Sequence, residues 1–170
     1  MSNFIKPSIE KNYDDEIRKV GFELEFSNID MHKILDILVN VENFKVKKIN
    51  NFFYELESVD GTYILELDFE LLTKQKLKKE AKKLFEKTNI QIDEQNIENI
   101  QNFIGSISKD IVPYEISTPP LPLDKLYKVD ELVNSLSENN AYGTKDKIYY
   151  AFGLHINVEL ITLETKSILS

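Results

Sequence analysis

The stretch Val20-Gly21-Phe22-Glu23-Leu24-Glu25-Phe26 decides how the rest of the chain is interpreted, because apolar and acidic residues alternate in it. Successive side chains of a β-strand point to opposite faces of the sheet, so the pattern predicts a strand over residues 19–27. The apolar side chains would face a buried core. Glu23 and Glu25 would stand on the other face, roughly 7 Å apart. On its own, the pattern also fits an ordinary strand with one face in water.

Length and composition favour one acidic domain. The chain has 170 residues and a formal net charge of −8, and it contains no cysteine. The negative charge argues against a general nucleic-acid binder, and the lack of thiols excludes disulfides and thiolate metal sites. Residues 1–19 lack the apolar core of a signal peptide, and no stretch of the sequence is long and apolar enough to cross a membrane. We therefore expect a cytoplasmic protein without nucleic-acid or membrane partners.

Helices are predicted between the strands. Asp30 is a suitable N-cap for a helix with an apolar stripe at helical spacing, formed by Ile34, Leu35, Leu38 and Val39. Helical patterns also cover residues 70–88, where the lysines are interpreted as a solvated face, and residues 93–108. A further helix over residues 123–139 would bury Leu126, Val129, Leu132, Val133 and Leu136.

A β-hairpin is predicted around Asp60-Gly61, a dipeptide typical of two-residue turns between alternating runs. In that register Glu55 lies directly opposite Glu66, and Glu57 and Asp68 share their face. Like charges in direct opposition destabilise a pair of strands unless a cation or a raised pKa relieves them. A slipped or bulged register, which would separate the two glutamates, is the alternative.

Two later segments repeat the alternation of apolar and polar residues. Around residues 111–118, Glu115 lies on the face opposite Tyr114 and Ile116, before two prolines end the strand. From residue 148 to 160 every second residue is apolar, and the other face carries His155, Asn157 and Glu159. Gly153 lies on that polar face, where it would allow a close approach to the backbone.

Together these strands predict an α+β fold, with a mostly antiparallel sheet and helices packed on one face. The open face would gather Glu23, Glu25, Glu55, Glu66, Asp68, Glu115, His155 and Glu159. Oxygen ligands of this kind suit Mg²⁺ or Mn²⁺, and one imidazole is compatible with Mn²⁺. For His155 alone, a packed or hydrogen-bonded histidine is the alternative.

Three segments, in order, resemble motifs of the amidoligase family. They are Val-Gly-Phe-Glu-Leu-Glu-Phe, Tyr-Glu-Ile-Ser-Thr-Pro-Pro-Leu-Pro-Leu and Tyr-Ala-Phe-Gly-Leu-His-Ile-Asn-Val-Glu-Leu. That family looks like a branch of the glutamine synthetase and glutamate–cysteine ligase superfamily. The resemblance implies that residues 19–170 are the N-terminal half of a glutamine synthetase-like catalytic domain, with its C-terminal part missing. Residues 1–18 would be a lead-in.

The resemblance also implies an activity, an ATP-dependent carboxylate–amine ligase that forms an amide through an acyl phosphate. Its substrates would be a small-molecule or peptide carboxylate and an amine, with ATP as co-substrate and Mg²⁺ or Mn²⁺ as cofactor. The residues that match the family's metal ligands are Glu23, Glu25, Glu115 and His155. Asn157 matches a position near the nucleotide phosphates. Glu66 and Asp68, whose strand also resembles the family, are further candidates for binding the nucleotide. Glu55 and Glu159 are further candidates on the polar face.

The chain departs from the superfamily in its cations, because Arg18 is its only arginine. Superfamily ligases bring arginines from a second half to the phosphates, and phosphoryl transfer depends on positioned positive charge. One hypothesis is therefore a ligase completed by a C-terminal half or a second chain. The other is a non-catalytic remnant that acts as a metal- or nucleotide-binding or protein-interaction module. A metal-dependent hydrolase fits poorly, because one polar-face histidine and no cysteine offer little for activating water.

Overall fold

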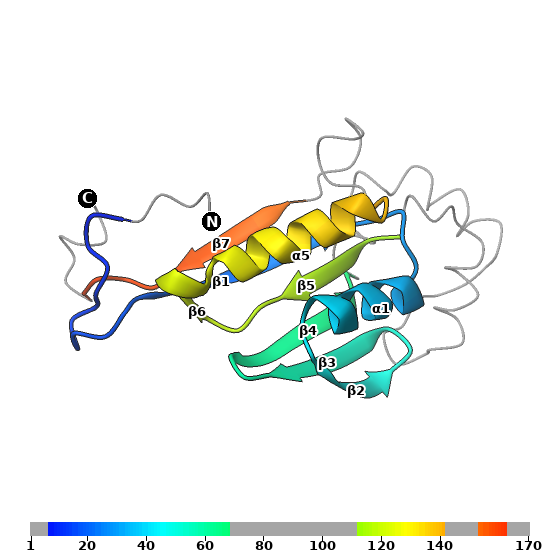
Figure 1. Cartoon of the computed structure of the whole chain (residues 1–170), viewed down its shortest axis with the longest axis horizontal. Coiled ribbons are helices and arrows are strands. Elements are labelled where there is room, and N and C mark those ends of the chain that lie inside the picture. Colours follow the sequence, from blue (N-terminus) through cyan, green and yellow to red (C-terminus); the bar gives the residue numbers. More distant parts are fainter. Residues whose placement is uncertain (1–6, 69–111, 142–152, 163–170) are drawn as a thin grey trace, which may run out of the picture.

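The computed structural model describes residues 7–68, 112–141 and 153–162. These residues form one seven-stranded sheet with two α-helices on one face (Figure 1). The strands are β1 (Lys19–Phe26), β2 (Lys45–Asn50), β3 (Phe53–Ser58), β4 (Gly61–Leu67), β5 (Tyr114–Ser117), β6 (Leu121–Pro122) and β7 (Leu154–Val158). The helices are α1 (Met31–Val41) and α5 (Tyr127–Glu138), and a 3₁₀ turn, η1 (Leu123–Lys125), precedes α5.

The sheet is antiparallel at every described pairing, in the order β2-β3-β4-β5-β1-β6. β7 also pairs with β1, and Leu24 has Ile116 of β5 on one side and Leu154 of β7 on the other. β1 therefore lies between β5 and β7 and can present its side chains to both. The predicted α+β fold with a mostly antiparallel sheet is confirmed.

The apolar face of the sheet is buried over β1, β3, β4 and β5, on the side of the two described helices. The apolar side of the last predicted strand was also expected to face the core, but Leu154, Ile156 and Val158 of β7 are 48%, 52% and 51% exposed, because β7 pairs only with β1 and lies at the edge of the described sheet. Phe22 of β1 is 2% exposed, as the alternation of the opening strand predicts. The largest fully buried side chains come from several elements: Phe22, Ile34, Leu38, Leu56, Leu65, Leu67, Ile116 and Leu121. Burial of one such side chain contributes about 1.5–3 kcal/mol to folding. This core fixes which face of each strand remains for polar chemistry.

The two predicted helices that lie in the described residues are confirmed, with two side chains as exceptions. The Asp30 carboxylate accepts a hydrogen bond from the Lys33 N–H at 3.0 Å, so the predicted N-cap of α1 is confirmed. Of the apolar residues predicted to be inward in the helix over residues 123–139, those that are buried are Leu126, Val129, Leu132 and Leu136. Val39 and Val133 were expected to be inward, but they are 44% and 41% exposed. Each follows a buried residue directly, and one step of about 100° turns it away from the core.

The β3–β4 hairpin differs from the prediction in its turn. Val59 and Asp60 form the turn, and Gly61 begins β4 opposite Ser58. A turn at Asp60-Gly61 was therefore the wrong prediction, and each strand residue has a partner two places from the expected one. A displacement of two leaves every side chain on its predicted face.

The predicted opposition of two glutamates in this hairpin is consequently wrong. Glu55 lies opposite Ile64, and Glu66 lies opposite Phe53. On the other side of β4, however, Glu66 lies opposite Glu115 of β5. Two glutamates are therefore opposed in the sheet, but between β4 and β5 rather than between β3 and β4.

Residues 7–18, predicted as a loose lead-in, contain a short turn. Lys11 and Ile17 form an antiparallel bridge, and the Asn12 side-chain carbonyl accepts the N–H groups of Asp14 and Glu16 at 3.0 Å. Arg18 then leads into β1 with only 8% of its surface exposed.

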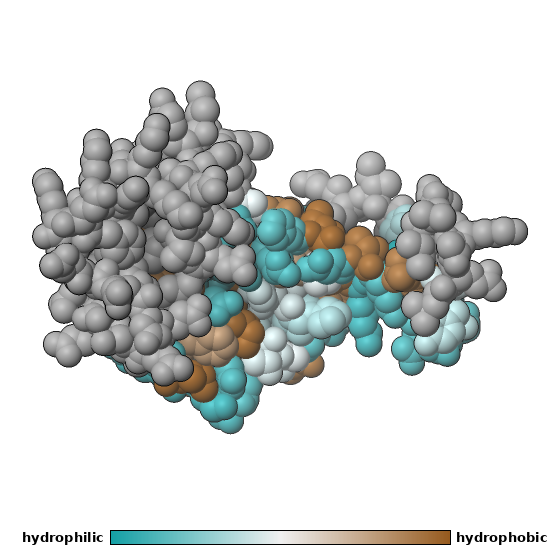
Figure 2. Space-filling view, turned by 180° about the vertical axis from the view of Figure 1, so that it is seen from behind, coloured by the Kyte–Doolittle hydropathy of each residue, from teal (hydrophilic) through white to brown (hydrophobic). Residues whose placement is uncertain are grey.

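The helices predicted over residues 70–88 and 93–108 lie outside the described residues, as do residues 148–152 of the predicted last strand. Neither described helix is long and apolar enough to cross a membrane. Figure 2 shows the molecule from behind, on the side that α1 and α5 do not cover. Hydrophilic residues lie near the centre of its coloured surface, and a hydrophobic band follows the upper edge.

Candidate metal centre

The register of β1 with its two neighbours brings the polar side chains of three strands together. Glu25 lies opposite Glu115 of β5, and Glu23 lies opposite His155 of β7. Paired residues of neighbouring strands point to the same face of a sheet. Glu23, Glu25, Glu115 and His155 thus share the open face, opposite the apolar side chains of their strands. Their role in binding metal stays a prediction.

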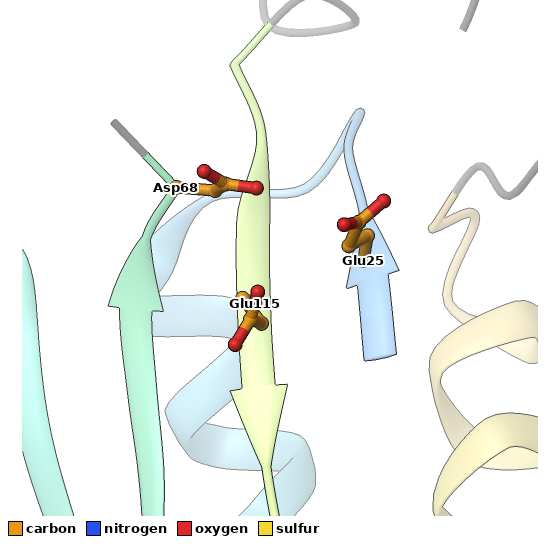
Figure 3. Close-up of side chains that lie close together, drawn as sticks. All are labelled: Glu25, Asp68 and Glu115. Atoms are coloured by element: carbon orange, nitrogen blue, oxygen red, sulfur yellow. The ribbon is translucent and has the colours of Figure 1, made fainter. Parts of the chain in front are cut away.

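Three carboxylates form the closest cluster on this face. Glu25, Asp68 and Glu115 each offer an oxygen, and the three oxygens lie within 4.8 Å of one another. Figure 3 shows Glu115 on β5 between Asp68, just past the end of β4, and Glu25 on β1. The Asp68 N–H donates to the Pro113 carbonyl at 3.0 Å, which continues the β4–β5 contact beyond the strand. We call Glu25, Asp68 and Glu115 the carboxylate cluster.

The electrostatics of this face disfavour a further negative charge. Burial raises the pKa of Glu115, and the charges of Asp68, Glu23 and Glu25 raise it further, against a hydrogen bond from Ser117 that lowers it. Burial likewise raises the pKa of Glu66, with the charges of Glu115 and Asp68 adding to the effect. A bound cation would relieve both groups.

A second group of polar side chains lies beside the cluster, toward β7. Both oxygens of Glu23 accept hydrogen bonds: Oε1 from the Asn157 amide at 3.0 Å, and Oε2 from His155 Nδ1 at 2.9 Å. The hydrogen bond to Glu23 raises the pKa of His155, and the charge of Glu25 adds to it. The other ring nitrogen, Nε2, lies 3.9 Å from Glu25 Oε1. His155 therefore connects Glu23 to the carboxylate cluster.

The comparisons with known proteins agree with the three motifs. A family model described as "Putative amidoligase enzyme" matches residues 16–170. The chain belongs to this family. The resemblance that the motifs suggest is thereby confirmed, and the family description indicates a ligase-type enzyme. The comparisons with curated proteins and with solved structures gave no match.

The carboxylate cluster of this amidoligase-family chain fits a small hard cation. Mg²⁺ binds oxygen ligands at about 2.1 Å, so two ligands on opposite sides of it are about 4.2 Å apart. Oxygens within 4.8 Å of one another are near that spacing. In the part of the chain that the structure describes, no lysine or arginine forms an ion pair with Glu25 or Glu115. The donor set and its charge therefore suit Mg²⁺ or Mn²⁺.

The other two polar-face candidates of this amidoligase-family chain, Glu55 and Glu159, interact with residues outside the carboxylate cluster. Glu55 pairs with Lys47 at 2.7 Å on β2. Glu159 follows β7 and accepts hydrogen bonds from Asn12 at 2.9 Å and from the Lys19 N–H at 2.8 Å. The Asn12 bond is the first cause that lowers the pKa of Glu159. Neither carboxylate belongs to the cluster.

Two residues of the site, Asp68 and Ser117, make contacts that the sequence did not predict. Asp68 was expected near a nucleotide, yet it is one of the three clustered carboxylates. Its position two residues after Glu66, on the same face, was the available signal. Ser117 was not considered, although its hydroxyl donates to Glu115 Oε1 at 2.8 Å. It follows Glu115 at the same spacing of two.

Proposed function

We propose that this chain carries the metal-binding site of an ATP-dependent ligase that joins a carboxylate to an amine. The observation that supports it is the carboxylate cluster, on the open face of an antiparallel sheet in a chain of the amidoligase family. In this proposal Glu25, Asp68 and Glu115 supply oxygen ligands. His155 adds a nitrogen ligand through Nε2, because Glu23 already occupies Nδ1. A carboxylate on one ring nitrogen is the usual way to fix a metal-binding histidine.

The remaining polar side chains of the site would position these ligands. Asn157 holds the second oxygen of Glu23, so the Glu23–His155 pair has one favoured geometry. In this proposal Asn157 and Glu66, which share the face of Glu23 and Glu115, would contact the nucleotide beside the metal. Mg²⁺ or Mn²⁺ held by these residues would supply positive charge that offsets the carboxylates and the triphosphate.

The proposed reaction has two steps. A substrate carboxylate oxygen attacks the γ-phosphorus of ATP, the bond to the bridging oxygen breaks, and ADP leaves. The amine nitrogen then attacks the acyl carbon, phosphate leaves with its bonding electrons, and the nitrogen loses a proton. Both steps need positive charge around the transferring phosphoryl group.

Arg18 is not placed to give that charge. Its guanidinium donates to the Glu159 carbonyl at 2.7 and 3.0 Å and to the Ile9 carbonyl at 2.9 Å. The cations would then come from metal, from lysines outside the described residues, or from a C-terminal half or second chain. The same observation favours a second candidate function, a non-catalytic module that binds metal and nucleotide.

The first test measures binding of Mn²⁺-ATP to the 170-residue chain by calorimetry. We expect binding that Glu115→Gln weakens at least about tenfold, since metal ligands and their partners commonly contribute that much. Glu57→Gln is the matched control, because Glu57 pairs with Lys45 at 3.0 Å, away from the cluster. Equal affinity for Mn²⁺-ATP in the wild type, Glu115→Gln and Glu57→Gln would show that the nucleotide does not bind at this face.

The second test asks whether the chain catalyses the reaction. Candidate carboxylates labelled with ¹⁸O are incubated with Mg-ATP and amines, and the released phosphate is analysed by mass spectrometry. Transfer of ¹⁸O to phosphate is expected from an acyl phosphate. Binding of Mn²⁺-ATP without amine-dependent ADP formation, across the panel, would favour the non-catalytic module.

A further inference from the structure

A pocket lies on the side of the sheet away from the carboxylate cluster. It has a volume of about 230 Å³ and lies where the end of α1 meets β4 and α5. The residues that matter for the argument are Glu42, Phe44, Tyr63, Tyr127, Lys128 and Glu131. A water molecule takes about 30 Å³ in the liquid, so there is room for a small organic molecule.

Three aromatic side chains, Phe44, Tyr63 and Tyr127, line the pocket. Phe44 and Tyr63 meet edge to face, with ring centroids 4.9 Å apart. Tyr127 begins α5 and is 41% exposed, so it borders the opening. Aromatic faces attract ammonium groups, and this attraction grows when the site is partly desolvated.

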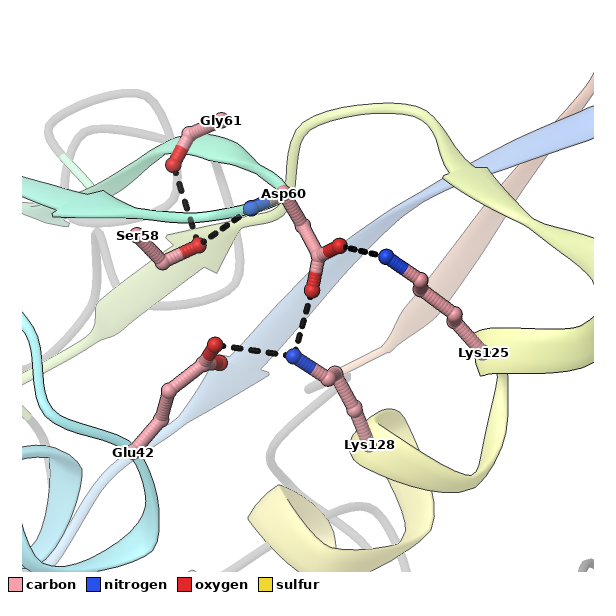
Figure 4. Close-up of polar contacts among 6 residues, drawn as sticks. All are labelled: Glu42, Ser58, Asp60, Gly61, Lys125 and Lys128. Carbon is pink, nitrogen blue, oxygen red and sulfur yellow. Dashed lines mark hydrogen bonds and ion pairs between the residues drawn. The ribbon is translucent and has the colours of Figure 1, made fainter.

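The basic side chain in the wall is already engaged. Lys128 donates to Glu42 at 2.8 Å and also to Asp60, and Lys125 donates to the other oxygen of Asp60 (Figure 4). The Asp60 side chain is only 2% exposed. Lys128 is thus held by two carboxylates and is a poor partner for an anionic ligand.

The charge balance around the pocket is negative. Two lysines, Lys125 and Lys128, face three carboxylates, those of Glu42, Asp60 and Glu131. Glu131 is exposed and lines the pocket, and within the described ranges no lysine, arginine or histidine forms an ion pair with it. A cationic ligand would balance the charge of these two lysines and three carboxylates.

A buried hydroxyl in the wall also lacks a partner. Tyr63 is 3% exposed, and its hydroxyl makes no hydrogen bond in the part of the chain described. Burial, followed by the negative charge of Glu42, raises the pKa of Tyr63 to about 12, so the hydroxyl keeps its proton. Native proteins rarely leave such a group unsatisfied.

We propose that this pocket binds a small primary amine with an apolar body. The ammonium group lies beside Glu131 and Glu42, and the apolar body packs against the aromatic walls. A small rearrangement brings the amine within reach of the Tyr63 hydroxyl. The site is separate from the proposed ligase chemistry, because the buried face of β4 that carries Tyr63 is opposite the face that carries Glu66.

The test uses three matched probes on the full chain without metal or ATP: benzylamine, benzyl alcohol and benzoate. Binding is followed by two-dimensional NMR of the backbone amides. We expect benzylamine to bind about tenfold more tightly than benzyl alcohol, since a charge-assisted hydrogen bond contributes that much, and benzoate not to bind. The amide signals of Tyr63 and Glu131 should move, and that of Glu25 should not.

Variants make the test specific. Glu131→Gln should weaken benzylamine binding about tenfold and leave benzyl alcohol unchanged. Tyr63→Phe, which removes only the buried hydroxyl, should weaken benzylamine by less and keep the fold. Glu138→Gln, at the end of the same helix and outside the pocket, is the control. Equal affinity for the amine and the alcohol, or no effect of Glu131→Gln, would overturn the proposal.

Discussion

Glu25 and Gly153 are joined by two hydrogen bonds. The Glu25 N–H donates to the Gly153 carbonyl at 2.9 Å, and the Gly153 N–H donates to Glu25 Oε2, also at 2.9 Å. A β-carbon at position 153 would lie 3.3 Å from that oxygen and 3.6 Å from His155 Nε2. The absence of a side chain thus allows the backbone to hold a carboxylate of the cluster.

Gly153→Ala should therefore weaken metal binding without unfolding the protein. The new methyl group displaces the Glu25 carboxylate by a few tenths of an ångström, and loss of such an orienting contact typically lowers metal affinity about 10–100-fold. We expect a loss at the lower end of that range, measured by titration with Mn²⁺ and electron paramagnetic resonance. The midpoint of thermal unfolding without metal should change little.

Gly21→Ala is the control for this substitution. A β-carbon at Gly21 would meet only the Asn157 β-carbon, at an ordinary distance of 3.7 Å. If both alanine variants bind Mn²⁺ as the wild type does, Gly153 has no role in holding Glu25 for a metal.

Glu115→Gln should distinguish the effect of charge repulsion on stability from the effect of metal binding on stability. Glu115 lies between Glu25 and Glu66 across the sheet, so removing its charge relieves repulsion in the metal-free protein. We expect a higher unfolding midpoint than the wild type without metal. Saturating Mn²⁺, at about a hundred times its dissociation constant, should add about 2.7 kcal/mol to the wild type and much less to the variant.

Glu55→Gln is the matched control for Glu115→Gln. Glu55 lies on the same face, but it pairs with Lys47 rather than with another acid. Its loss should leave the Mn²⁺ stabilisation unchanged and should not raise the metal-free midpoint. A full Mn²⁺ effect in Glu115→Gln would exclude Glu115 as a ligand.

The sequence predicts the faces of the sheet better than its register. Alternation assigns each side chain of β3 and β4 correctly, because the two-residue displacement of the hairpin preserves parity. The turn itself depends on distant contacts. The Asp60 carboxylate is held by lysines of η1 and α5, and Gly61, with φ 127°, lies so close to Pro119 that a β-carbon would be 2.9 Å away. A local dipeptide pattern contains none of this information.

The same limit applies to the polar face. Parity predicts that Glu23 and Glu25 share it, but not that Glu23 pairs with His155 while Glu25 joins Asp68. That division depends on side-chain conformations and on which strands are neighbours. Asp68 enters the cluster because β4 lies beside β5, a pairing between segments separated by more than forty residues that local patterns cannot reveal.

Asp60→Asn should destabilise the protein in a pH-dependent manner. Burial by itself would raise the pKa of Asp60, but hydrogen bonds from Lys125 and Lys128 outweigh it and lower the pKa below 3.8. A lowered folded-state pKa stabilises the fold above the unfolded value, and this stability is lost as pH falls through the folded value. We expect a cost of about 3 kcal/mol at pH 7, because a buried partner of two lysines is removed.

Urea unfolding of wild type and Asp60→Asn at several pH values between 7 and 3 measures this effect. The difference in unfolding free energy should shrink toward the acid end, where the wild-type carboxylate begins to take up its proton. Asp36→Asn, an exposed position on α1, should cost little at any pH. A difference that is constant over the whole range would show that Asp60 acts through shape rather than charge.

Arg18 links the segment before β1 to the segment after β7 through hydrogen bonds. Its guanidinium donates to the carbonyls of Ile9 and Glu159, and the Glu159 N–H donates to the Lys19 carbonyl at 3.0 Å. A lysine cannot reproduce this fork of donors, although it keeps the charge. The geometry of the side chain, rather than its charge, should therefore determine the stability of this end of the sheet.

Arg18→Lys should cost about 2 kcal/mol of unfolding free energy, the usual value for hydrogen bonds from a charged group. Hydrogen exchange should speed up at the amides of Arg18 and Glu159, which are bonded to the Glu10 and Lys19 carbonyls. Mn²⁺ affinity should be nearly unchanged, because Arg18 does not contact the carboxylate cluster. Lys33→Arg, at an exposed position of α1, controls for the exchange of one basic side chain for the other. Wild-type stability in Arg18→Lys would show that the fork of hydrogen bonds does not stabilise this end of the sheet. A selective loss of Mn²⁺-ATP binding would instead indicate that the guanidinium acts on the ligand.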